Sequence, residues 1–437
     1  MQLPEDFIRE TRLLMGEERF NRFMEAFNED APVSIRLNPH KIRNEKLEIR
    51  NDDYQTSAKS AYRSNQNFSF LIPNSSLNNV PWCPEGFYLE GRPQFTFDPL
   101  FHAGCYYVQE AASMFVTHIL RELSNHNSSF LIPHSSLSVL DMCAAPGGKS
   151  TAIRTVLPEG SVLVSNEPIP TRAQILLENI TKWGWPDCIV TNNYPRDFRK
   201  AKAKFDIILC DVPCSGEGMF RKDPATISEW SLQNVEKCWR LQREIVADAW
   251  ECLNPGGLLI YSTCTYNTKE NEENVRWIME EYDAEALEVP TDPSWHITGS
   301  LLEGFDAPVY RFIPGITRSE GLFVCALRKR GKRSEERGVR NILKQIERLK
   351  VISLPTPPPS TLHKIDLPYQ EALKYLRGEA LVLPPDTPRG IITMTYKGVP
   401  LGPMKNIGNR ANNLYPKPWR IKTTHLPTEE IKIIDIQ

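Results

Sequence analysis

Two cysteines stand at the ends of neighbouring predicted strands, where they could serve as nucleophiles. Cys214 follows the apolar strand 205–212 in DVPCSGEG, and Cys264 lies in YSTCTYN within the next predicted strand, 257–266. The carboxyl ends of adjacent parallel strands open onto one crevice, so both thiols are expected to reach the same substrate. A free cysteine on a strand is more often a packing residue. Each of these two follows a small or rigid residue at a strand end, which is less typical of a core and favours thiolate chemistry.

A glycine-containing loop precedes both cysteines in the chain. CAAPGGKS joins the apolar strand 138–142 to a predicted helix. Gly147 and Gly148 allow close backbone approach, and the start of the helix offers free N–H groups to a carboxylate. The loop matches neither the GxGxxG fingerprint nor the P-loop, which argues against an NAD or ATP site. A single turn of this kind is a weak signal on its own.

Acidic side chains lie at or after the ends of three predicted strands. Glu167 ends SVLVSNE, where it could accept hydrogen bonds from a ribose diol; a solvated loop glutamate is the alternative. Asp197 follows the strand 188–193, near asparagines that could read an adenine edge. Asp211 closes the strand before the first of the two cysteines and is expected to face the same crevice.

Strands and helices alternate from residue 138 onward. Such alternation indicates a doubly wound, mostly parallel α/β sheet, which would bring these loops and side chains to one edge. The predicted strands span 138–142, 161–167, 188–193, 205–212, 257–266 and 321–329, and the predicted helices span 147–157, 171–184, 231–253 and 269–282.

Smaller units are predicted on both sides of this sheet. Upstream, the pattern predicts one or two amphipathic helices in 4–28, a strand at 32–39 and a long helix at 106–123. Downstream, a basic, proline-rich linker spans 331–360, and the residues after it predict a small domain rich in β-structure.

The net charge of −2 hides an asymmetry. Residues 328–437 contain 21 Lys and Arg against 10 Asp and Glu, whereas the rest of the chain contains 31 against 44. A basic tail on an acidic body indicates contact with a polyanion. A solvated surface with one basic linker is the alternative.

Composition argues against several classes of protein. No run of about 18 uncharged apolar residues is present, so no membrane span is expected. The acidic, amphipathic N-terminus does not resemble a signal peptide, which favours a cytoplasmic location. The ten cysteines do not show the paired spacing of a zinc site, so we expect reduced thiols and no metal.

Two segments of the chain repeat each other. Residues 64–77 and 124–137 agree at 11 of 14 positions, and both are rich in Asn and Ser. Two copies are too few for a stacked repeat architecture. They are interpreted as a duplicated insertion looped out on the surface.

A reactive thiol beside a methyl donor fits methylation of cytosine at carbon 5. This carbon is a poor nucleophile until a thiolate adds to carbon 6, which makes carbon 5 enamine-like. Carbon 5 can then take a methyl group from a sulfonium donor, and removal of its proton lets the thiolate leave. Lys149, Arg221 and Lys222 are candidates to lower a thiol pKa or to hold phosphate. Spacing does not say which cysteine attacks.

At these residues the chain resembles a known family. CAAPGGKS, DVPCSGEG and STCTYNTKENEENV resemble, in order, the motifs of the Nol/Nop/Sun RNA cytosine-C5 methyltransferases. SIRLNP and YYVQEAASM resemble the same family, and GNRANNLYPKPWRIK resembles the RNA-binding tail of the bacterial ribosomal RNA enzymes of the RsmF type.

The resemblance implies the domain organisation. The catalytic part would be a class I S-adenosylmethionine-dependent methyltransferase, which is Rossmann-like with a mostly parallel sheet. A small N-terminal α+β domain and a C-terminal PUA-like, β-rich domain would flank it. The expected boundaries are 1–105 for the N-terminal RNA-binding or flanking domain, 106–330 for the catalytic domain, 331–360 for the linker and 361–437 for the C-terminal RNA-binding domain.

The resemblance also implies roles for individual residues. Cys264 would be the nucleophile, Cys214 would help to release the product, and Asp211 would border the methionine end of the cofactor and the target base. In the DNA cytosine-C5 enzymes the cysteine of the Pro-Cys motif attacks instead, so the choice of Cys264 rests on the RNA family. The residues expected to bind S-adenosylmethionine are Cys143, Ala144, Ala145, Pro146, Gly147, Gly148, Lys149, Glu167, Arg172, Asp197 and Asp211.

The implied partner is RNA with an unpaired or flipped cytosine, foremost 16S ribosomal RNA, bound by a monomer. Tyr415 and Trp419 would stack on bases, or else pack in the core of a small domain. A transfer RNA methyltransferase and a non-catalytic RNA-binding assembly factor are the alternatives; the full tail argues against the first, and the intact cysteines and loop against the second. An amino-group methyltransferase would need a polar-aromatic motif in place of Pro-Cys. The basic residues expected to contact phosphates are Lys405, Arg410, Lys417, Arg420 and Lys422.

Overall fold

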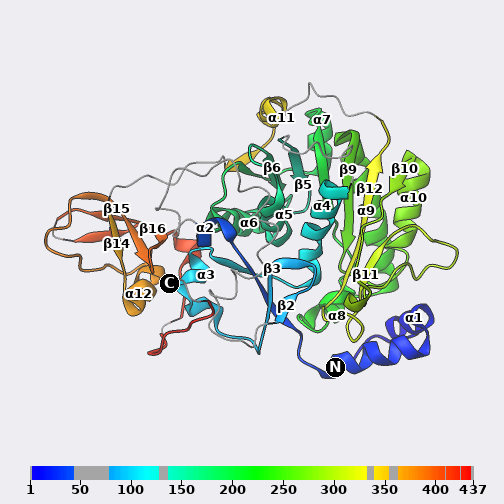
Figure 1. The fold of residues 1–437 in the computed structure, drawn as a ribbon, viewed down its shortest axis with the longest axis horizontal. Coiled ribbons are helices and arrows are strands. Elements are labelled where there is room, and N and C mark those ends of the chain that lie inside the picture. The colour runs from blue at the N-terminus through cyan, green and yellow to red at the C-terminus, as the bar shows by residue number, and fades with distance from the viewer. Residues whose placement is uncertain are drawn as a thin grey trace.

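A sheet of nine strands occupies the middle of the molecule (Figure 1). Its parallel strands run in the order β7-β6-β5-β8-β9, and antiparallel strands extend both edges. The computed structural model describes residues 2–43, 78–126, 136–331, 339–353, 363–408, 410–423 and 425–434. The parallel strands are β5 (Ser138–Asp141), β6 (Val162–Asn166), β7 (Cys188–Thr191), β8 (Phe205–Asp211) and β9 (Leu253–Thr263); the antiparallel ones are β10 (Ala284–Ala286), β11 (Tyr310–Phe312), β12 (Leu322–Lys329) and β13 (Val351–Ser353).

Helices cover both faces of this sheet, because its central strands are apolar on both sides. Along β8, Ile207 and Leu209 join the core on one face, whereas Ile208 and Cys210 join the core on the other. The doubly wound fold predicted from the sequence is therefore confirmed. Helices α4 (Phe115–His126), α5 (Gly148–Val156) and α6 (Pro170–Trp183) cover the first face, and α7 (Pro195–Lys200), α9 (Leu232–Cys252) and α10 (Glu272–Tyr282) cover the second.

The N-terminal domain is built on a four-stranded antiparallel sheet in the order β2-β3-β1-β4. The fully buried Arg36 of β1 connects it to the catalytic domain. Its guanidinium donates to Thr151 Oγ1 at 2.6 Å and to Gln109 Oε1 at 2.8 Å, and it lies 4.5 Å from the ring of Trp183. The elements of this domain are β1 (Val33–Leu37), α2 (Pro39–Arg43), β2 (Asn78–Val80), β3 (Cys83–Leu89), α3 (Pro99–His102) and β4 (Tyr106–Val108).

The long helix predicted at 106–123 is wrong over its first residues. Tyr106–Val108 form strand β4, which pairs with β1, and helix α4 begins only at Phe115. The backbone N–H of Gln109 continues this pairing to the carbonyl of Ser34 at 3.1 Å. Strand pairing with distant residues overrides the local helical pattern here.

Helix α1 (Glu5–Glu25) packs on the segments that follow the two cysteines. The ring of Phe7 lies 5.1 Å from that of Phe220, and the ring of Phe23 lies 5.1 Å from that of Tyr266. The short helix α8 (Ala225–Glu229) belongs to the same region of the chain. The N-terminal helix therefore supports the loops that lead away from the candidate active site.

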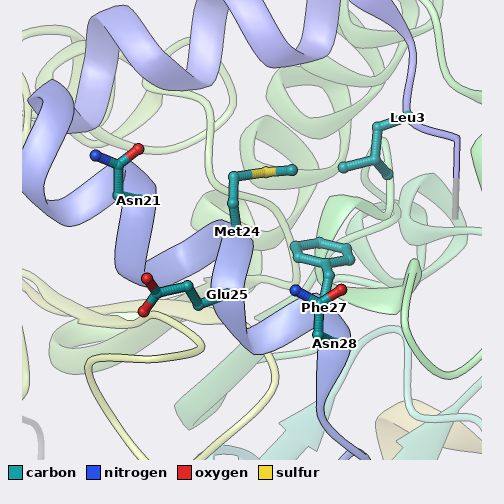
Figure 2. A pocket seen from close by; sticks show the side chains of 6 residues that line it. All are labelled: Leu3, Asn21, Met24, Glu25, Phe27 and Asn28. Atoms are coloured by element: carbon teal, nitrogen blue, oxygen red, sulfur yellow. The ribbon is translucent and has the colours of Figure 1, made fainter.

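A break at Gly16 divides α1 into two parts, because its φ of 71° and ψ of 164° are not helical. The second part borders a pocket near the start of the chain (Figure 2). The side chains around it are Leu3, Asn21, Met24, Glu25, Phe27 and Asn28. None of the residues predicted to act on a substrate or a cofactor lines this pocket.

The C-terminal domain is a four-stranded sheet with one helix, and it packs against the N-terminal domain (Figure 1). Residues of both domains share one hydrophobic core. Tyr369 donates a hydrogen bond to the carbonyl of Phe97 at 3.0 Å. The elements are β14 (Lys364–Asp366), α12 (Tyr369–Arg377), β15 (Gly390–Tyr396), β16 (Val399–Asn406) and β17 (Ala411–Asn413).

The middle of the expected linker 331–360 forms regular secondary structure that packs on the catalytic domain. Residues 339–353 contain helix α11 (Val339–Ile346) and strand β13, and β13 pairs with β7 at the edge of the central sheet. Ile342 and Ile346 join the core of the catalytic domain. The Lys, Arg and Pro content of the segment signals a linker, but its apolar residues at helical spacing bury against the sheet.

The sequence analysis also made predictions about the repeated segments, the cysteines and membrane-spanning helices. The repeated segment 64–77 and most of its second copy, at 127–135, lie outside the described residues. All ten cysteines are free thiols, and seven of them are buried. No helix among the described residues is long and apolar enough to cross a membrane.

Candidate active site

The two cysteines meet where strands β8 and β9 end. The sulfur of Cys214 lies 3.2 Å from the sulfur of Cys264, and the backbone N–H of Cys264 donates to the Cys214 sulfur at 3.3 Å. Both side chains are partly exposed. The hydrogen bond to Cys264 and burial raise the pKa of the Cys214 thiol well above its ordinary value.

Asp211 and Lys149 form an ion pair beside these thiols. Lys149 Nζ lies 2.8 Å from one carboxylate oxygen of Asp211, and Ser262 Oγ donates to the other at 2.6 Å. Burial opposes the charge of Lys149, but Asp211 and Cys264 together raise its pKa above the ordinary value. The structure therefore brings together four residues that were predicted from separate motifs.

The loop Cys143–Lys149 crosses the sheet edge between β5 and α5, where the strand order reverses. This is the place where open α/β sheets bind ligands. Gly147 has φ 113°, and a side chain there would lie 3.2 Å from Leu176, so the turn requires glycine. The backbone N–H of Ala144 donates to the carbonyl of Asn166 at 2.7 Å, which ties the loop to the end of β6.

Glu167 is buried just after β6, and one of its carboxylate oxygens accepts no hydrogen bond. Its Oε1 accepts from the N–H of Ile169 at 3.0 Å, whereas the buried Oε2 makes no hydrogen bond. Nη1 of the half-exposed Arg172 lies 3.4 Å from Oε2, and Nη2 donates to the carbonyl of Ala145 at 2.9 Å. A buried carboxylate oxygen without a hydrogen bond is what a ligand hydroxyl would satisfy.

Asp141 lies beneath the same loop. Burial raises its pKa to about 7, against the hydrogen bond that Ser150 Oγ donates at 2.7 Å. Its second oxygen is buried without a partner. Asp141 lies two residues before Cys143, at the end of β5, and the sequence analysis assigned it no role.

Asp197 stabilises the start of helix α7. It caps helix α7 by accepting from the backbone N–H of Tyr194 at 3.0 Å. The neighbouring Asn192 donates to the carbonyl of Glu167 at 2.8 Å and accepts from Lys350 Nζ at 2.6 Å. Lys350, from the expected linker, thus contacts the cofactor side of the sheet, and nothing in its local sequence signalled this.

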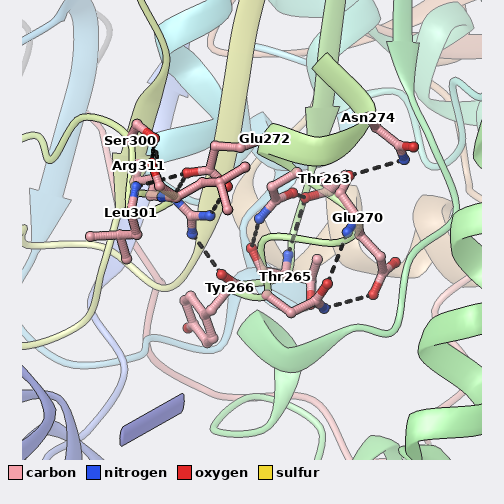
Figure 3. Close-up of polar contacts among 12 residues, drawn as sticks. Thr263, Thr265, Tyr266, Glu270, Glu272, Asn274, Ser300, Leu301 and Arg311 are labelled. Atoms are coloured by element: carbon pink, nitrogen blue, oxygen red, sulfur yellow. Dashed lines mark hydrogen bonds and ion pairs between the residues drawn. The ribbon is translucent and has the colours of Figure 1, made fainter. Parts of the chain in front are cut away.

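The loop after Cys264 is held by the start of helix α10 (Figure 3). Thr263 Oγ1 donates to Asn271 Oδ1 at 2.6 Å, and Asn271 Nδ2 donates to the carbonyl of Thr265 at 3.0 Å. Arg311, which forms a buried ion pair with Glu272, donates to the carbonyl of Tyr266 at 2.7 Å. The motif NTKENEENV therefore holds the residues next to Cys264 in the chain, through Asn271.

Arg221, a candidate to lower a thiol pKa or to hold phosphate, is engaged by other groups of the protein. Arg221 forms a buried ion pair with Glu320 and donates to the carbonyl of Ala26 at 2.6 Å, which joins the end of α1 to the catalytic domain. Lys222 is exposed and lies near the same carboxylate of Glu320. Of the three basic candidates, Lys149 is the one beside the cysteines.

The aromatic residues of the C-terminal segment divide between core and surface. Tyr415 is buried in the core of the domain, as in the alternative interpretation, and Arg420 donates to its carbonyl at 3.2 Å. Trp419 packs partly on this core, and Lys182 of helix α6 lies 5.7 Å from its ring. Four of the predicted basic residues are exposed: Lys405, Arg410, Lys417 and Lys422.

Among the described residues, no group of three or more His, Cys, Asp or Glu side chains is arranged to hold a metal ion. The site consists of a sheet edge with the Rossmann strand order, a loop with paired glycines and a buried acid on the next strand. These features fit a Rossmann-like methyltransferase, the class that takes its methyl group from S-adenosylmethionine.

Three family models match successive parts of the chain. Residues 51–111 match the N-terminal domain of 16S rRNA methyltransferase RsmF, residues 128–328 match 16S rRNA methyltransferase RsmB/F, and residues 362–421 match the methyltransferase RsmF PUA domain. In this order the three models follow the domain order of RsmF, and the chain is similar to the RsmB/F methyltransferases along most of its length. The family resemblance seen in the sequence motifs is thus confirmed.

Individual relatives agree with this assignment. Ribosomal RNA small subunit methyltransferase F of Cronobacter sakazakii is 37% identical over 265 residues, which are 58% of this chain and 52% of that protein. The protein of the same name from Salmonella agona is 34% identical over 339 residues, 75% of this chain and 63% of that one. The chain thus spans about half to two thirds of the length of these relatives.

A solved structure shares the fold. A methyltransferase homologue from Pyrococcus horikoshii has 25% sequence identity and a TM-score of 0.54, over 75% of this chain and 100% of that one.

Proposed function

We propose that this chain uses S-adenosylmethionine to methylate carbon 5 of a cytosine in 16S ribosomal RNA. The observation that carries the proposal is the pair of thiols 3.2 Å apart at the ends of β8 and β9, beside Asp211 and Lys149. A methyltransferase that alkylates an amino group needs no nucleophilic thiol, whereas carbon 5 of cytosine must first be activated by one.

We assign the role of nucleophile to Cys264, as the resemblance to the RNA family implies. The sulfur of Cys214 lies 3.2 Å away, close enough to exchange a proton with it. In the proposed reaction the thiolate of Cys264 adds to carbon 6, which makes carbon 5 nucleophilic toward the methyl group that bound S-adenosylmethionine would give up from its sulfonium sulfur. The carbon 5 proton then passes to a base, and the electron pair of that C–H bond re-forms the double bond between carbons 5 and 6 as the bond from carbon 6 to the Cys264 sulfur breaks. We propose that Cys214 assists this release.

Asp211 and Lys149 are the charged residues that lie beside the two thiols. Their ion pair is partly buried, with side-chain exposures of 31% and 16%, and Ser262 fixes the carboxylate from the other side. A held carboxylate can orient the amino group of a cytosine, and a held ammonium favours the thiolate form of a neighbouring cysteine. Bound S-adenosylmethionine supplies the electrophilic methyl group.

The cofactor fits the residues around Glu167. The Oε2 of Glu167, which has no hydrogen-bond donor in the protein, would accept from a ribose hydroxyl, and the loop Cys143–Lys149 would lie against the methionine part. Arg172 and Asp197 stay in the proposal as residues at the rim, where each already has a protein partner.

Replacing Glu167 with glutamine is expected to weaken binding of S-adenosylhomocysteine by about 10- to 100-fold, the loss of one charge-assisted hydrogen bond. Isothermal titration calorimetry measures this directly and needs no RNA. Glu159→Gln, in an exposed turn, is the matched control. Equal affinities of the two variants would remove Glu167 from the cofactor site.

The RNA would be held by the domains that flank the catalytic sheet. The shared core of the N- and C-terminal domains makes them one unit, and the exposed Lys405, Arg410, Lys417 and Lys422 give it positive charge. A cytosine must leave its stack to reach thiols at a sheet edge, so an unpaired or flipped base is the proposed substrate. Action as a monomer in the cytoplasm completes the proposal.

Bisulfite mapping of ribosomal and transfer RNA tests the whole proposal. RNA from cells with and without the gene should differ at one or a few cytosines of 16S ribosomal RNA. A difference confined to transfer RNA would replace the substrate and keep the chemistry. No difference in either RNA would overturn the proposed function.

A further inference from the structure

Two fully buried side chains hold the peptide groups on both sides of Cys214. Gln242 Nε2, from the middle of α9, donates to the carbonyl of Pro213 at 2.9 Å. Glu270 Oε2, from the residues just before α10, accepts from the backbone N–H of Ser215 at 3.0 Å. The two side chains also bond each other, because Gln242 Nε2 donates to Glu270 Oε2 at 2.6 Å.

The orientation of Gln242 is fixed by its other end. Its Oε1 accepts from Asn274 Nδ2 at 2.8 Å, and the other end of the Asn274 amide is fixed because Asn274 Oδ1 accepts from Arg243 Nε at 3.0 Å. The amide nitrogen of Gln242 must therefore face Glu270 and Pro213. If the amide of Gln242 were turned around, or were replaced by a methyl group, a buried donor would be left without an acceptor.

Glu270 also reaches the loop that carries Cys264. Its Oε1 accepts from Asn267 Nδ2 at 2.8 Å, and its backbone N–H donates to Asn267 Oδ1 at 2.9 Å. The hydroxyls of Ser215 and Thr265, each the residue after one of the cysteines, lie 2.8 Å apart. One carboxylate therefore connects the two cysteine loops.

The surroundings of Glu270 accept only a carboxylate of this shape. All three side-chain and backbone partners of its oxygens are donors, which leaves no place for the NH₂ of a glutamine. Burial and the nearby carboxylate of Glu217 raise the pKa of Glu270 to about 7, so the network holds this group at an energetic cost. Such a cost is typical of functional sites.

We propose that Glu270 and Gln242 are positioning residues that set the sulfur of Cys214 against that of Cys264 and thereby control release of the methylated RNA. The inference rests on the proposed function, because release has a meaning only if Cys264 forms a covalent bond to RNA. Their hydrogen bonds go to the carbonyl of Pro213 and the N–H of Ser215, not to the thiol of Cys214. They act through the peptide groups before and after it.

Glu270→Gln and Gln242→Met test this role without removing a thiol. Each variant is incubated with S-adenosylmethionine and a 16S ribosomal RNA fragment, and the RNA-linked protein is separated on a denaturing gel. Both variants should turn over about tenfold more slowly or worse, since misplacing a reacting group by about 1 Å can cost 100-fold. Both should accumulate RNA-linked protein, as expected of Cys214→Ala, while a single round of methyl transfer proceeds at the normal rate.

The controls separate this inference from the function on which it rests. Glu280→Gln, at an exposed position of α10, should behave as the unmodified protein. If bisulfite mapping finds no methylated cytosine that depends on this gene, the proposed function fails; if Cys264→Ala still captures RNA, the roles of the two cysteines are reversed. If the two cysteine variants behave as expected but Glu270→Gln and Gln242→Met release RNA normally, or lose the covalent species altogether, only the positioning role is overturned. Should Glu270→Gln not fold, as judged by circular dichroism, Gln242→Met decides.

Discussion

Cys264→Ala is expected to abolish both turnover and covalent capture of RNA, whereas Cys214→Ala captures RNA and fails to release it. Loss of a covalent nucleophile reduces the rate by about 10⁴-fold or more. The two sulfurs lie 3.2 Å apart, so any difference between the variants must come from their roles and not from access.

Electrophoresis of labelled RNA under denaturing conditions measures the covalent species, and transfer of labelled methyl groups measures turnover. Cys238→Ala, at a partly buried cysteine on α9, is the matched control and should retain activity. Activity in Cys264→Ala, or loss of the covalent species in Cys214→Ala alone, would reverse the assignment.

Arg311→Met is expected to destabilise the protein by about 3–5 kcal/mol, the largest stability effect that we expect from a single change. The guanidinium and the carboxylate of Glu272 are both buried, with exposures of 1% and 0% (Figure 3). Removing the cation leaves a buried carboxylate that still accepts from the backbone N–H of Leu301 at 3.0 Å. It also releases the carbonyl of Tyr266, two residues beyond Cys264.

Chemical denaturation followed by tryptophan fluorescence measures this loss. Arg240→Met breaks an exposed ion pair with Glu236 and should cost no more than about 1 kcal/mol. The double variant Glu272→Leu, Arg311→Met should be more stable than Arg311→Met alone, because it no longer buries an unpaired charge. A loss below about 1 kcal/mol in Arg311→Met would show that water reaches this site.

The parts of the site that sequence patterns predict are those carried by strand ends. Cys214, Cys264 and Asp211 each end or follow an apolar strand, and parallel pairing then brings them to one edge. Glu270 and Gln242 escaped prediction because their partners lie 55 and 29 residues away in the chain. Only the packing of α9 and α10 on the sheet brings them together.

The elements that were mispredicted share one cause. Tyr106–Val108 lie in a helical pattern but pair with β1, and the charged segment near Lys350 carries a strand that pairs with β7. In both places a partner from a distant part of the chain decides the structure. Periodicity within a short window cannot detect such a partner.

Strand β13 sets a limit on how the chain can be shortened. A fragment that stops near residue 330 would leave the backbone groups of β7 unpaired along an open sheet edge, which is a template for aggregation. It would also remove Lys350, whose backbone N–H and carbonyl both bond Asn193. A catalytic fragment intended for crystallisation or binding assays should therefore extend through Ser353.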